Sequence, residues 1–149
     1  MIRKATVNDV KQIFKLVNYY AKKNRMLPRS FNELYENVRD FVIYLEGKTV
    51  YGCSALHVDW DDLGEIKSLA VAPSRIHRGI GTRLLRYCLG DAKQLKLKKV
   101  FALTYIPEFF EQFGFKLIDK QNLPHKIWSE CIKCIHFPDC SENALLKEL

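Results

Sequence analysis

Apolar residues in the first third of the chain recur at the spacing of helices. An extended segment over residues 2–6 precedes hydrophobic positions three and four residues apart, which predict an amphipathic helix bearing Val10, Ile13, Phe14, Val17 and Ala21. Thr6 and Asp9 have the spacing of a capping box for that helix. A segment containing a proline then breaks the pattern. Ser30 and Glu33 form a second capping box, which predicts a short helix bearing Leu34, Tyr35 and Val38.

The middle of the chain changes to the patterning of strands. Residues 40–45 and 49–58 are rich in Val, Ile, Tyr and Phe, and a short segment with a glycine separates them. This arrangement predicts a β-hairpin. A third extended run covers residues 63–71, and a fourth covers residues 98–105. Between these two runs, the apolar positions return to a period of 3.6 residues, which predicts the longest helix of the chain.

That helix opens at a glycine-rich turn, residues 78–81. Its apolar face comprises Ile80, Leu84, Leu85, Cys88, Leu89, Ala92 and Leu95. Pro107 suits the first turn of a later short helix, closed by Gly114, whose apolar residues are Phe109, Phe110 and Phe113. Two further extended segments are predicted at residues 115–118 and 144–149.

The order of these elements predicts one mixed α/β domain over residues 1–149, with an early antiparallel hairpin and a central β-α-β unit. Hydrophobic residues make up 48% of the chain and charged residues 28%, which suffices for a packed core. The apolar runs are far shorter than the roughly 20 residues of a membrane span. The N-terminus does not resemble a signal peptide, and the cysteine number is odd, so we expect reduced thiols and a cytoplasmic protein.

The net charge predicts an anionic partner. Lys and Arg number 24 against 17 Asp and Glu, which gives a formal charge of +7. Such a chain suits nucleic acid, a membrane surface, a nucleotide-like cofactor or an acidic substrate, and a merely solvated basic surface is the alternative. The basic residues are scattered rather than interleaved with aromatic ones, which argues against nucleic acid as the partner.

The glycine-rich turn has the features of a pyrophosphate site. A turn between a strand and a helix leaves backbone N–H groups at the positive end of the helix dipole, and Gly79 and Gly81 let an anion approach them. A tight turn that binds no ligand is the alternative. A P-loop is excluded because its glycine–lysine signature is absent, and a dinucleotide fingerprint is excluded because Leu84 replaces its third glycine.

Three stretches of the sequence resemble motifs of the GNAT superfamily of N-acetyltransferases. Residues 69–73 followed by 78–85 resemble its motif A, and residues 109–115 resemble its closing motif, a short helix that ends in Gly-Phe. The order of elements over residues 2–119 agrees with this superfamily. The resemblance implies the acyl-CoA N-acyltransferase fold, an α/β fold with splayed central strands, and acetyl-CoA as the co-substrate.

In that fold, the pantetheine lies between the splayed strands, and the resemblance implies backbone contacts at Leu69, Ala70 and Val71. It implies a pyrophosphate site at the backbone amides of Ile76, His77, Arg78, Gly79, Ile80, Gly81 and Thr82. One position departs from the pattern: Ile76 stands where the superfamily usually has Gln or Arg, and Arg75 lies one residue early. Phe110, assigned to the cofactor site, stands where the superfamily commonly has a tyrosine acid.

Acetyl transfer to an amine needs a base, because an ammonium group cannot attack a carbonyl. Glu65 lies on the strand before the turn, where the superfamily often has its base, and partial burial would raise the pKa of this carboxyl group toward a useful value. A structural ion pair, for example with Lys67, is the alternative. Backbone N–H groups near Leu69 and Ala70 could polarise the thioester carbonyl. A dedicated acid is not required, because a thiolate is a good leaving group.

A closer resemblance, over nearly the whole chain, is to short amino-acid N-acetyltransferases that act as N-acetylglutamate synthases. The matching stretches are residues 26–30, 64–71, 100–105 and 123–128. In those enzymes, an arginine in an Arg-Ser loop helps to hold the substrate carboxylate, and the corresponding residue is Arg29. The resemblance therefore implies acetylation of the α-amine of L-glutamate, in arginine biosynthesis.

Elementary electrostatics supports a cationic pocket for such a substrate. Burying an unpaired carboxylate costs several kcal/mol, and Arg29 can form a bidentate pair with one of the two carboxylates of glutamate. Lys67 shares a strand face with Glu65 by the alternation of strands and could meet the other. Glutamine or another amino acid would satisfy much of the same pocket. A protein N-terminus, a lysine or a polyamine remains an alternative acceptor.

The C-terminal region contains Cys131, Cys134, His136 and Cys140. These are enough soft ligands for tetrahedral zinc, but only one Cys-x-x-Cys pair occurs where strong zinc signatures have two. Buried thiols or a redox pair are the simpler interpretations, and we expect no metal requirement. A basic nucleic-acid-binding module or a zinc-stabilised adaptor is the alternative to an enzyme. A homodimer is compatible with the sequence, which does not fix the oligomeric state.

Overall fold

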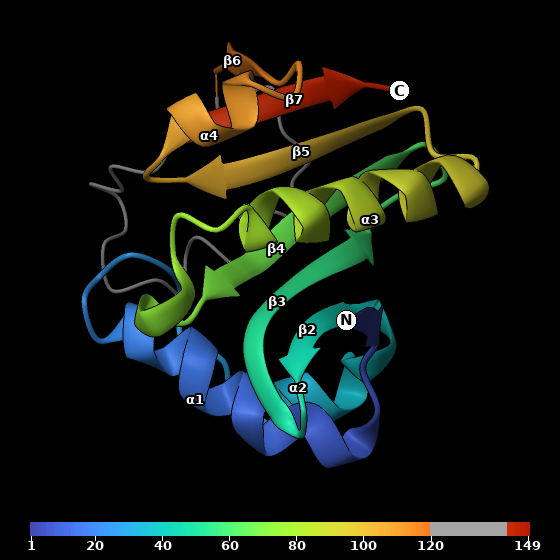
Figure 1. The fold of residues 1–149 in the computed structure, drawn as a ribbon. Coiled ribbons are helices and arrows are strands. Elements are labelled where there is room, and N and C mark those ends of the chain that lie inside the picture. The colour runs from blue at the N-terminus through green and yellow to red at the C-terminus, as the bar shows by residue number, and fades with distance from the viewer. Residues whose placement is uncertain (120–142) are drawn as a thin grey trace.

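The computed structural model describes residues 1–119 and 143–149 of the chain, and these residues form one seven-stranded mixed sheet with helices on both faces (Figure 1). The strands, in sheet order, are β1 (Ile2–Lys4), β2 (Phe41–Glu46), β3 (Thr49–Val58), β4 (Leu63–Val71), β5 (Lys99–Thr104), β7 (Asn143–Glu148) and β6 (Lys116–Ile118). The helices are α1 (Val10–Ala21), α2 (Phe31–Glu36), α3 (Ile80–Gln94) and α4 (Pro107–Glu111). The predicted mixed α/β class is confirmed.

The two central strands are parallel for only part of their length. Residues Leu63–Ile66 of β4 pair with Lys99–Ala102 of β5. Beyond this paired region, β4 continues to Val71 and β5 continues to Thr104. Their carboxyl-terminal halves therefore separate, as the diverging arrows in Figure 1 show. The splayed central strands expected from the sequence are thus present, and they open a cleft in the middle of the sheet.

A bulge interrupts β4 just where it leaves β5. On the other side of β4, Cys53 of β3 pairs with Ala70 and Ala55 pairs with Lys67, so one residue of β3 lies opposite two of β4. Ser68, inside this bulge, has a φ of 55°. Residues other than glycine seldom adopt this left-handed conformation. The bulge therefore marks a strained peptide at the edge of the cleft.

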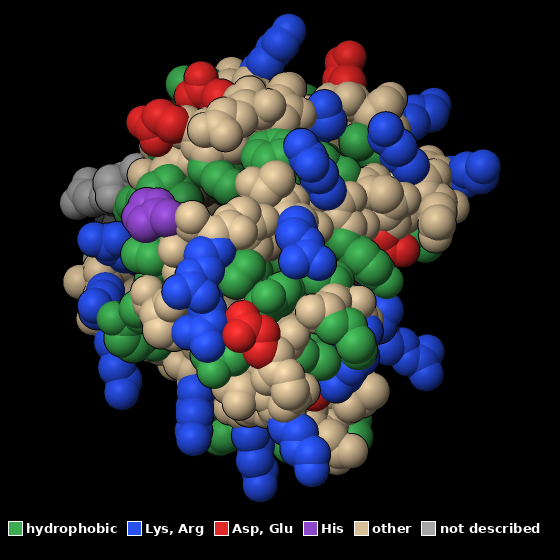
Figure 2. Space-filling view, in the orientation of Figure 1, with side chains coloured by type: hydrophobic (Ala, Val, Ile, Leu, Met, Phe, Trp, Pro, Cys, Tyr) green, Lys and Arg blue, Asp and Glu red, His purple; other side chains and the backbone are tan. Residues whose placement is uncertain are grey.

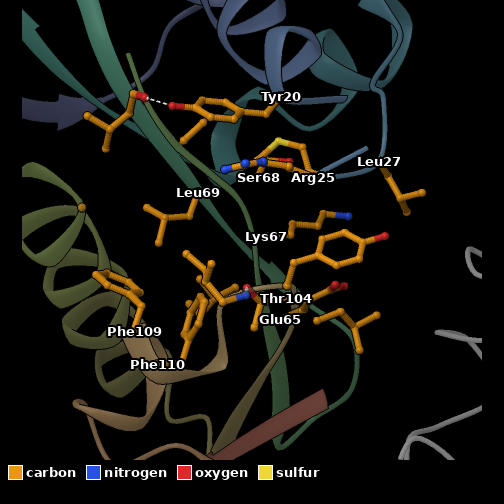
Figure 3. A pocket seen from close by; sticks show the side chains of 18 of the residues that line it. Tyr20, Arg25, Leu27, Glu65, Lys67, Ser68, Leu69, Thr104, Phe109 and Phe110 are labelled. Atoms are coloured by element: carbon orange, nitrogen blue, oxygen red, sulfur yellow. Dashed lines mark hydrogen bonds between the residues drawn. The ribbon is translucent and has the colours of Figure 1, made fainter. Parts of the chain in front are cut away.

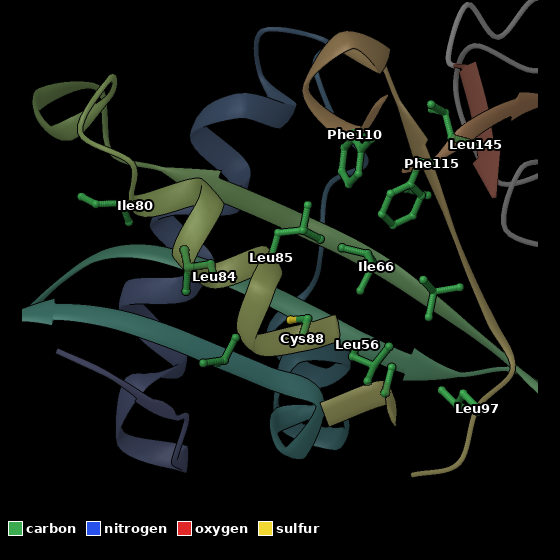
Figure 4. Packing of buried hydrophobic residues seen from close by; sticks show 14 residues of the cluster. Leu56, Ile66, Ile80, Leu84, Leu85, Cys88, Leu97, Phe110, Phe115 and Leu145 are labelled. Atoms are coloured by element: carbon green, nitrogen blue, oxygen red, sulfur yellow. The ribbon is translucent and has the colours of Figure 1, made fainter. Parts of the chain in front are cut away.

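Each face of the sheet carries its own hydrophobic core. The α3 face contains a cluster of buried residues in which α3 packs against the sheet and α4 (Figure 4), including Leu56, Ile66, Leu84, Leu85, Cys88 and Phe110. The α1 face contains a second cluster, including Val10, Ile13, Val17, Ile43, Cys53 and Ala55. Each large apolar side chain buried in this way stabilises the fold by about 1.5–3 kcal/mol. The two cores fix β4 from both sides.

Several predicted boundaries need correction. Val38, predicted for the second helix, lies in a separate 3-10 turn because α2 ends at Glu36. Leu95, predicted for the apolar face of α3, is 52% exposed. The reason is that Lys96 adopts a left-handed conformation and the N–H of Leu97 donates to Ala92, which ends the helix and buries Leu97 instead.

The first predicted strand is also shorter than expected. β1 ends at Lys4, because Thr6 caps the 3-10 turn that precedes α1 and its N–H donates to the carboxylate of Asp9 over 2.7 Å. Asp9 also accepts two hydrogen bonds from Arg3, and this guanidinium lowers the pKa of the Asp9 carboxyl group. The predicted capping box is therefore confirmed, with an added ion pair to the strand.

The candidate zinc ligands Cys131, Cys134, His136 and Cys140, and the matching stretch 123–128, lie outside the described residues. Within the described ranges, no cluster of three or more His, Cys, Asp or Glu side chains could hold a metal ion. A search of the same ranges finds no helix with the length and apolar character to cross a membrane.

Candidate active site

A cavity of about 280 Å³ opens where β4 and β5 separate. Its walls come from β4, the end of β5, α4 and the segment between α1 and α2. Figure 3 shows Phe109 and Phe110 at one side of the cavity and Arg25 and Leu27 at the opposite side, with side chains of β4 between them. The side chains of β4 thus lie between an aromatic side of the cavity and a side that contains Arg25.

Glu65 and Lys67 both line this cavity, as strand alternation predicts. Glu65 is 5% exposed, so its carboxylate is almost completely removed from bulk water. Lys67 lies two residues further along β4, just before the bulge. The structure thus brings together an acidic and a basic side chain at the point where the cleft begins.

Arg29 reaches the same cavity from the segment between α1 and α2. Asn18 of α1 holds its backbone on both sides: the N–H of Arg29 donates to Oδ1 over 3.2 Å, and Nδ2 donates to the carbonyl of Arg29 over 3.0 Å. The Arg29 side chain is only 12% exposed and lies 3.4 Å from the carboxylate of Glu33. Three cationic residues, Arg25, Arg29 and Lys67, therefore line the cavity together with Glu65.

The glycine-rich turn lies beside the cavity and has the predicted conformation. His77 and Gly79 have positive φ angles of 63° and 78°, and α3 begins directly after Gly79. A Cβ atom at Gly79 would meet no atom within 4 Å, so space around the residue does not require a glycine. The positive φ angle favours glycine at this position. The N–H groups of the first turn of α3 have no carbonyl partner within the helix and can bind an anion.

The residues predicted for the cofactor fall into two groups. One group lines the cavity and comprises Leu69, Ala70, Val71, Ile76, Gly81 and Phe110. The other group forms the adjoining turn and the start of α3, outside the cavity wall, and comprises His77, Arg78, Gly79, Ile80 and Thr82. The side chain of Ile80 is buried in the core, so this residue can offer a ligand only its backbone.

The side chain of Arg75 contacts two residues of the β2–β3 hairpin. Its Nε donates to the carboxylate of Glu46 over 3.1 Å, and its guanidinium lies 4.1 Å from the centre of the Tyr51 ring. These contacts tie the loop after β4 to the β2–β3 hairpin. The Lys and Arg side chains otherwise spread over the visible face in Figure 2, rather than gathering in one stripe.

Sequence reasoning missed one residue of the cavity wall and one residue that pairs with Glu65 across the strands. Tyr20 of α1 lines the cavity, and the Tyr20 hydroxyl donates a hydrogen bond to the carbonyl of Val71 (Figure 3). Burial raises the pKa of this hydroxyl, which keeps it protonated. His57 of β3 lies directly opposite Glu65, and its Nδ1 is 2.6 Å from the carboxylate of Asp40, which raises the pKa of His57. Both contacts join distant segments, so no local sequence pattern indicates them.

The geometry fits acetyl-CoA at the turn and in the cleft. The turn offers the backbone amides of a helix N-terminus to a pyrophosphate, and the separated half of β4 offers backbone groups to a pantetheine. Phe110 has no hydroxyl and packs against Phe109 and Phe115, with ring centres 5.3 Å from each, so it contributes a hydrophobic wall. Tyr105 also lines the cavity.

Known proteins with similar sequences are acetyltransferases. Residues 7–115 match the acetyltransferase (GNAT) family. The chain is 40% identical over 134 residues to an amino-acid acetyltransferase of Mycobacterium tuberculosis, a match that covers 87% of this chain and 76% of that protein. It is 34% identical over 148 residues to an uncharacterized N-acetyltransferase of Chlorobaculum tepidum, covering 99% and 96% of the two chains.

Solved structures give the same result. A Mycobacterium tuberculosis protein crystallised in complex with CoA has a TM-score of 0.84 and 33% identity, and the match covers 100% of this chain and 99% of that one. The N-acetylglutamate synthase of Neisseria gonorrhoeae, crystallised with coenzyme A and N-acetyl-glutamate, has a TM-score of 0.91 and 28% identity. The match covers 100% of this chain but only 35% of that protein. The chain therefore belongs to the GNAT acetyltransferase family and is an N-acetyltransferase that uses acetyl-CoA.

Proposed function

We propose that this enzyme transfers the acetyl group of acetyl-CoA to the α-amine of L-glutamate. The observation that carries the proposal is the set of charges at one cavity: Arg29 and Lys67 can each meet one carboxylate of the substrate, and Glu65 can meet its ammonium group. The Mycobacterium tuberculosis and Neisseria relatives, named for amino-acid acetylation or for N-acetylglutamate synthesis, support this choice of substrate.

Each of these side chains has a distinct task in the reaction. Acetyl-CoA supplies an acetyl group activated as a thioester. Glu65 accepts a proton from the substrate ammonium, since only the neutral amine can attack. The amine nitrogen then bonds to the acetyl carbon while the carbon–sulfur bond breaks. The second proton of the nitrogen leaves with the CoA sulfur, so that the products are the N-acetylated amino acid, CoA thiol and the proton on Glu65.

The backbone of β4 supplies the remaining contribution. Negative charge develops on the thioester oxygen during attack, and a fixed N–H donor aimed at that oxygen stabilises it. We assign this task to the N–H of Leu69, the second residue of the bulge, which lines the cavity. Arg29 and Lys67 hold the carboxylates away from this point, which orients the amine toward the acetyl group.

The proposal is tested by measuring thiol release from acetyl-CoA with a panel of acceptors. The panel contains L-glutamate, L-glutamine, L-aspartate, L-lysine, spermidine and a short peptide with a free N-terminus. We expect the highest kcat/KM with L-glutamate. Preference for glutamine would contradict glutamate as the substrate, because Lys67 would then face an uncharged amide instead of a carboxylate. Preference for spermidine or for the peptide would contradict the amino-acid proposal as a whole. The Lys67→Met variant should lower the ratio of kcat/KM for glutamate to kcat/KM for glutamine, because it removes the cation proposed to bind a carboxylate of glutamate.

A further inference from the structure

The buried thiol of Cys53 contacts the bulge in β4 from the α1 side of the sheet. Cys53 lies on β3 at the register shift, is fully buried in the α1-side core, and pairs across the strands with Ala70. Its Sγ donates a hydrogen bond to the carbonyl oxygen of Ser68 over 3.3 Å. Ser68 is the residue with the strained left-handed conformation. The thiol therefore contacts a carbonyl within the bulge, where the regular register of β3 and β4 is interrupted.

This contact fixes the direction of the next N–H group. The peptide that joins Ser68 and Leu69 is planar and trans, so its C=O and its N–H point in opposite directions. The C=O points toward the Cys53 thiol, a side chain of β3 that lies in the α1-side core. The N–H of Leu69 consequently points away from this thiol. Leu69 lines the cleft that opens where β5 has separated from β4, so its N–H can serve a ligand there.

We propose that Cys53 is a positioning residue for acetyl transfer: its thiol holds the Ser68–Leu69 peptide so that the Leu69 N–H faces the thioester oxygen. The inference rests on the task assigned above to the Leu69 N–H, and it does not depend on which amine is acetylated. Cys53 touches neither substrate and acts only through the backbone of β4.

The chemistry of the thiol suits this task. Burial raises the pKa of Cys53 to about 12, partly offset by hydrogen bonding with the backbone of Ala70, so the group stays protonated and remains a donor. A serine hydroxyl at the same position would keep a donor of similar size. An alanine would remove this donor from the Ser68 carbonyl.

The matched control is Cys88, the other buried cysteine of the described residues. It lies on the opposite face of the sheet, in the α3-side core, where its Sγ is 3.6 Å from the hydroxyl of Ser54. Cys53→Ala and Cys88→Ala delete the same buried atom, so both variants lose stability by creating a cavity. Only Cys53→Ala also releases the Ser68–Leu69 peptide.

The experiment compares kcat and KM of Cys53→Ala, Cys53→Ser and Cys88→Ala at a temperature at which all are folded. The acceptor is the amine that the wild-type enzyme acetylates fastest, so that failure of the glutamate proposal leaves this test intact. We expect Cys53→Ala to lower kcat by roughly 10–100-fold, the scale for a misplaced donor, with little change in either KM. Cys53→Ser should recover most of the rate, and Cys88→Ala should keep it.

A second measurement reads the peptide directly and needs no turnover. In NMR spectra of the protein without substrates, Cys53→Ala should shift the Ser68 carbonyl carbon and the Leu69 amide, whereas Cys88→Ala should leave both in place. The proposal is overturned if these signals do not move, or if Cys53→Ala and Cys88→Ala have equal kcat values. Unequal kcat values and shifted signals, with Cys53→Ser restored, support it.

Discussion

The role of Arg29 in holding a carboxylate can be tested by removing its side chain. Arg29→Ala deletes a guanidinium that is 12% exposed at the cavity wall, while the backbone of this residue stays held by the side chain of Asn18. The variant should therefore fold normally, because both hydrogen bonds from the Asn18 side chain reach only main-chain atoms of residue 29. We expect KM for glutamate to rise and the affinity for acetyl-CoA to stay unchanged.

The expected size of the effect follows from two opposing contributions. A charge-assisted hydrogen bond to the substrate is worth about 1.5–3 kcal/mol. Without substrate, Arg29 pairs with Glu33 at 3.4 Å, but Glu33 is 52% exposed and lies four residues away on the same segment. Such a pair is worth only about 0.3–0.5 kcal/mol. The difference, about 1–2.5 kcal/mol, corresponds to a rise in KM of about 5- to 70-fold.

The assay is initial-rate thiol release with glutamate varied at saturating acetyl-CoA. Arg29→Lys should fall between wild type and Arg29→Ala, because it keeps the charge and loses the bidentate geometry. Glu33→Gln should lower KM by no more than about 2-fold, since it removes the competing carboxylate. Arg25 provides the control: it also lines the cavity but is exposed, so Arg25→Ala should raise KM less. Equal KM values for wild type and Arg29→Ala would refute the reasoning.

Three further outcomes are expected. Glu65→Gln should lower kcat by roughly 10²–10⁴-fold and recover at high pH, and an unchanged pH–rate profile would leave Glu65 a structural role. Gly81→Asp should abolish CoA binding in calorimetry while thermal unfolding stays near wild type, because its Cβ would meet Phe109 at an ordinary 3.6 Å. Asp40 raises the pKa of His57 above 6.5, so their pair stabilises the protein below that pH and loses this contribution as pH rises. Asp40→Asn should therefore reduce the free energy of unfolding by at most about 1 kcal/mol near pH 5.5 and by less near pH 9, and an effect independent of pH would contradict this assignment.

The sequence predicted the features that depend on nearby residues. The turn at Gly79 and its position before α3 were predictable because the motif is contiguous. The shared face of Glu65 and Lys67 follows from strand alternation. The splayed strands were expected from the family resemblance rather than from any periodicity.

Features that depend on register between distant segments could not be predicted in this way. Nothing in the local pattern indicates that His57 lies opposite Glu65, because the pairing of β3 with β4 sets that relation. The sequence does not indicate the bulge at Ser68 either, because a serine and not a glycine adopts the left-handed conformation there. The clamp between Asn18 and Arg29 joins a helix to a loop through one side-chain amide, a contact that many polar residues could make.

The position of β7 between β5 and β6 has a consequence for how the cleft forms. β5 provides one wall of the cleft, and its outer edge is paired only with β7 along Lys99–Thr104, among the described residues. β6 pairs with β7 and not with β5, so it cannot join the sheet before β7 arrives. Until residues 143–148 dock, β5 is an edge strand with open hydrogen-bonding groups, which is a surface prone to pairing with another chain. Slow closure of this long-range contact would thus expose nascent or heat-stressed molecules to aggregation at the strand that later forms the active site.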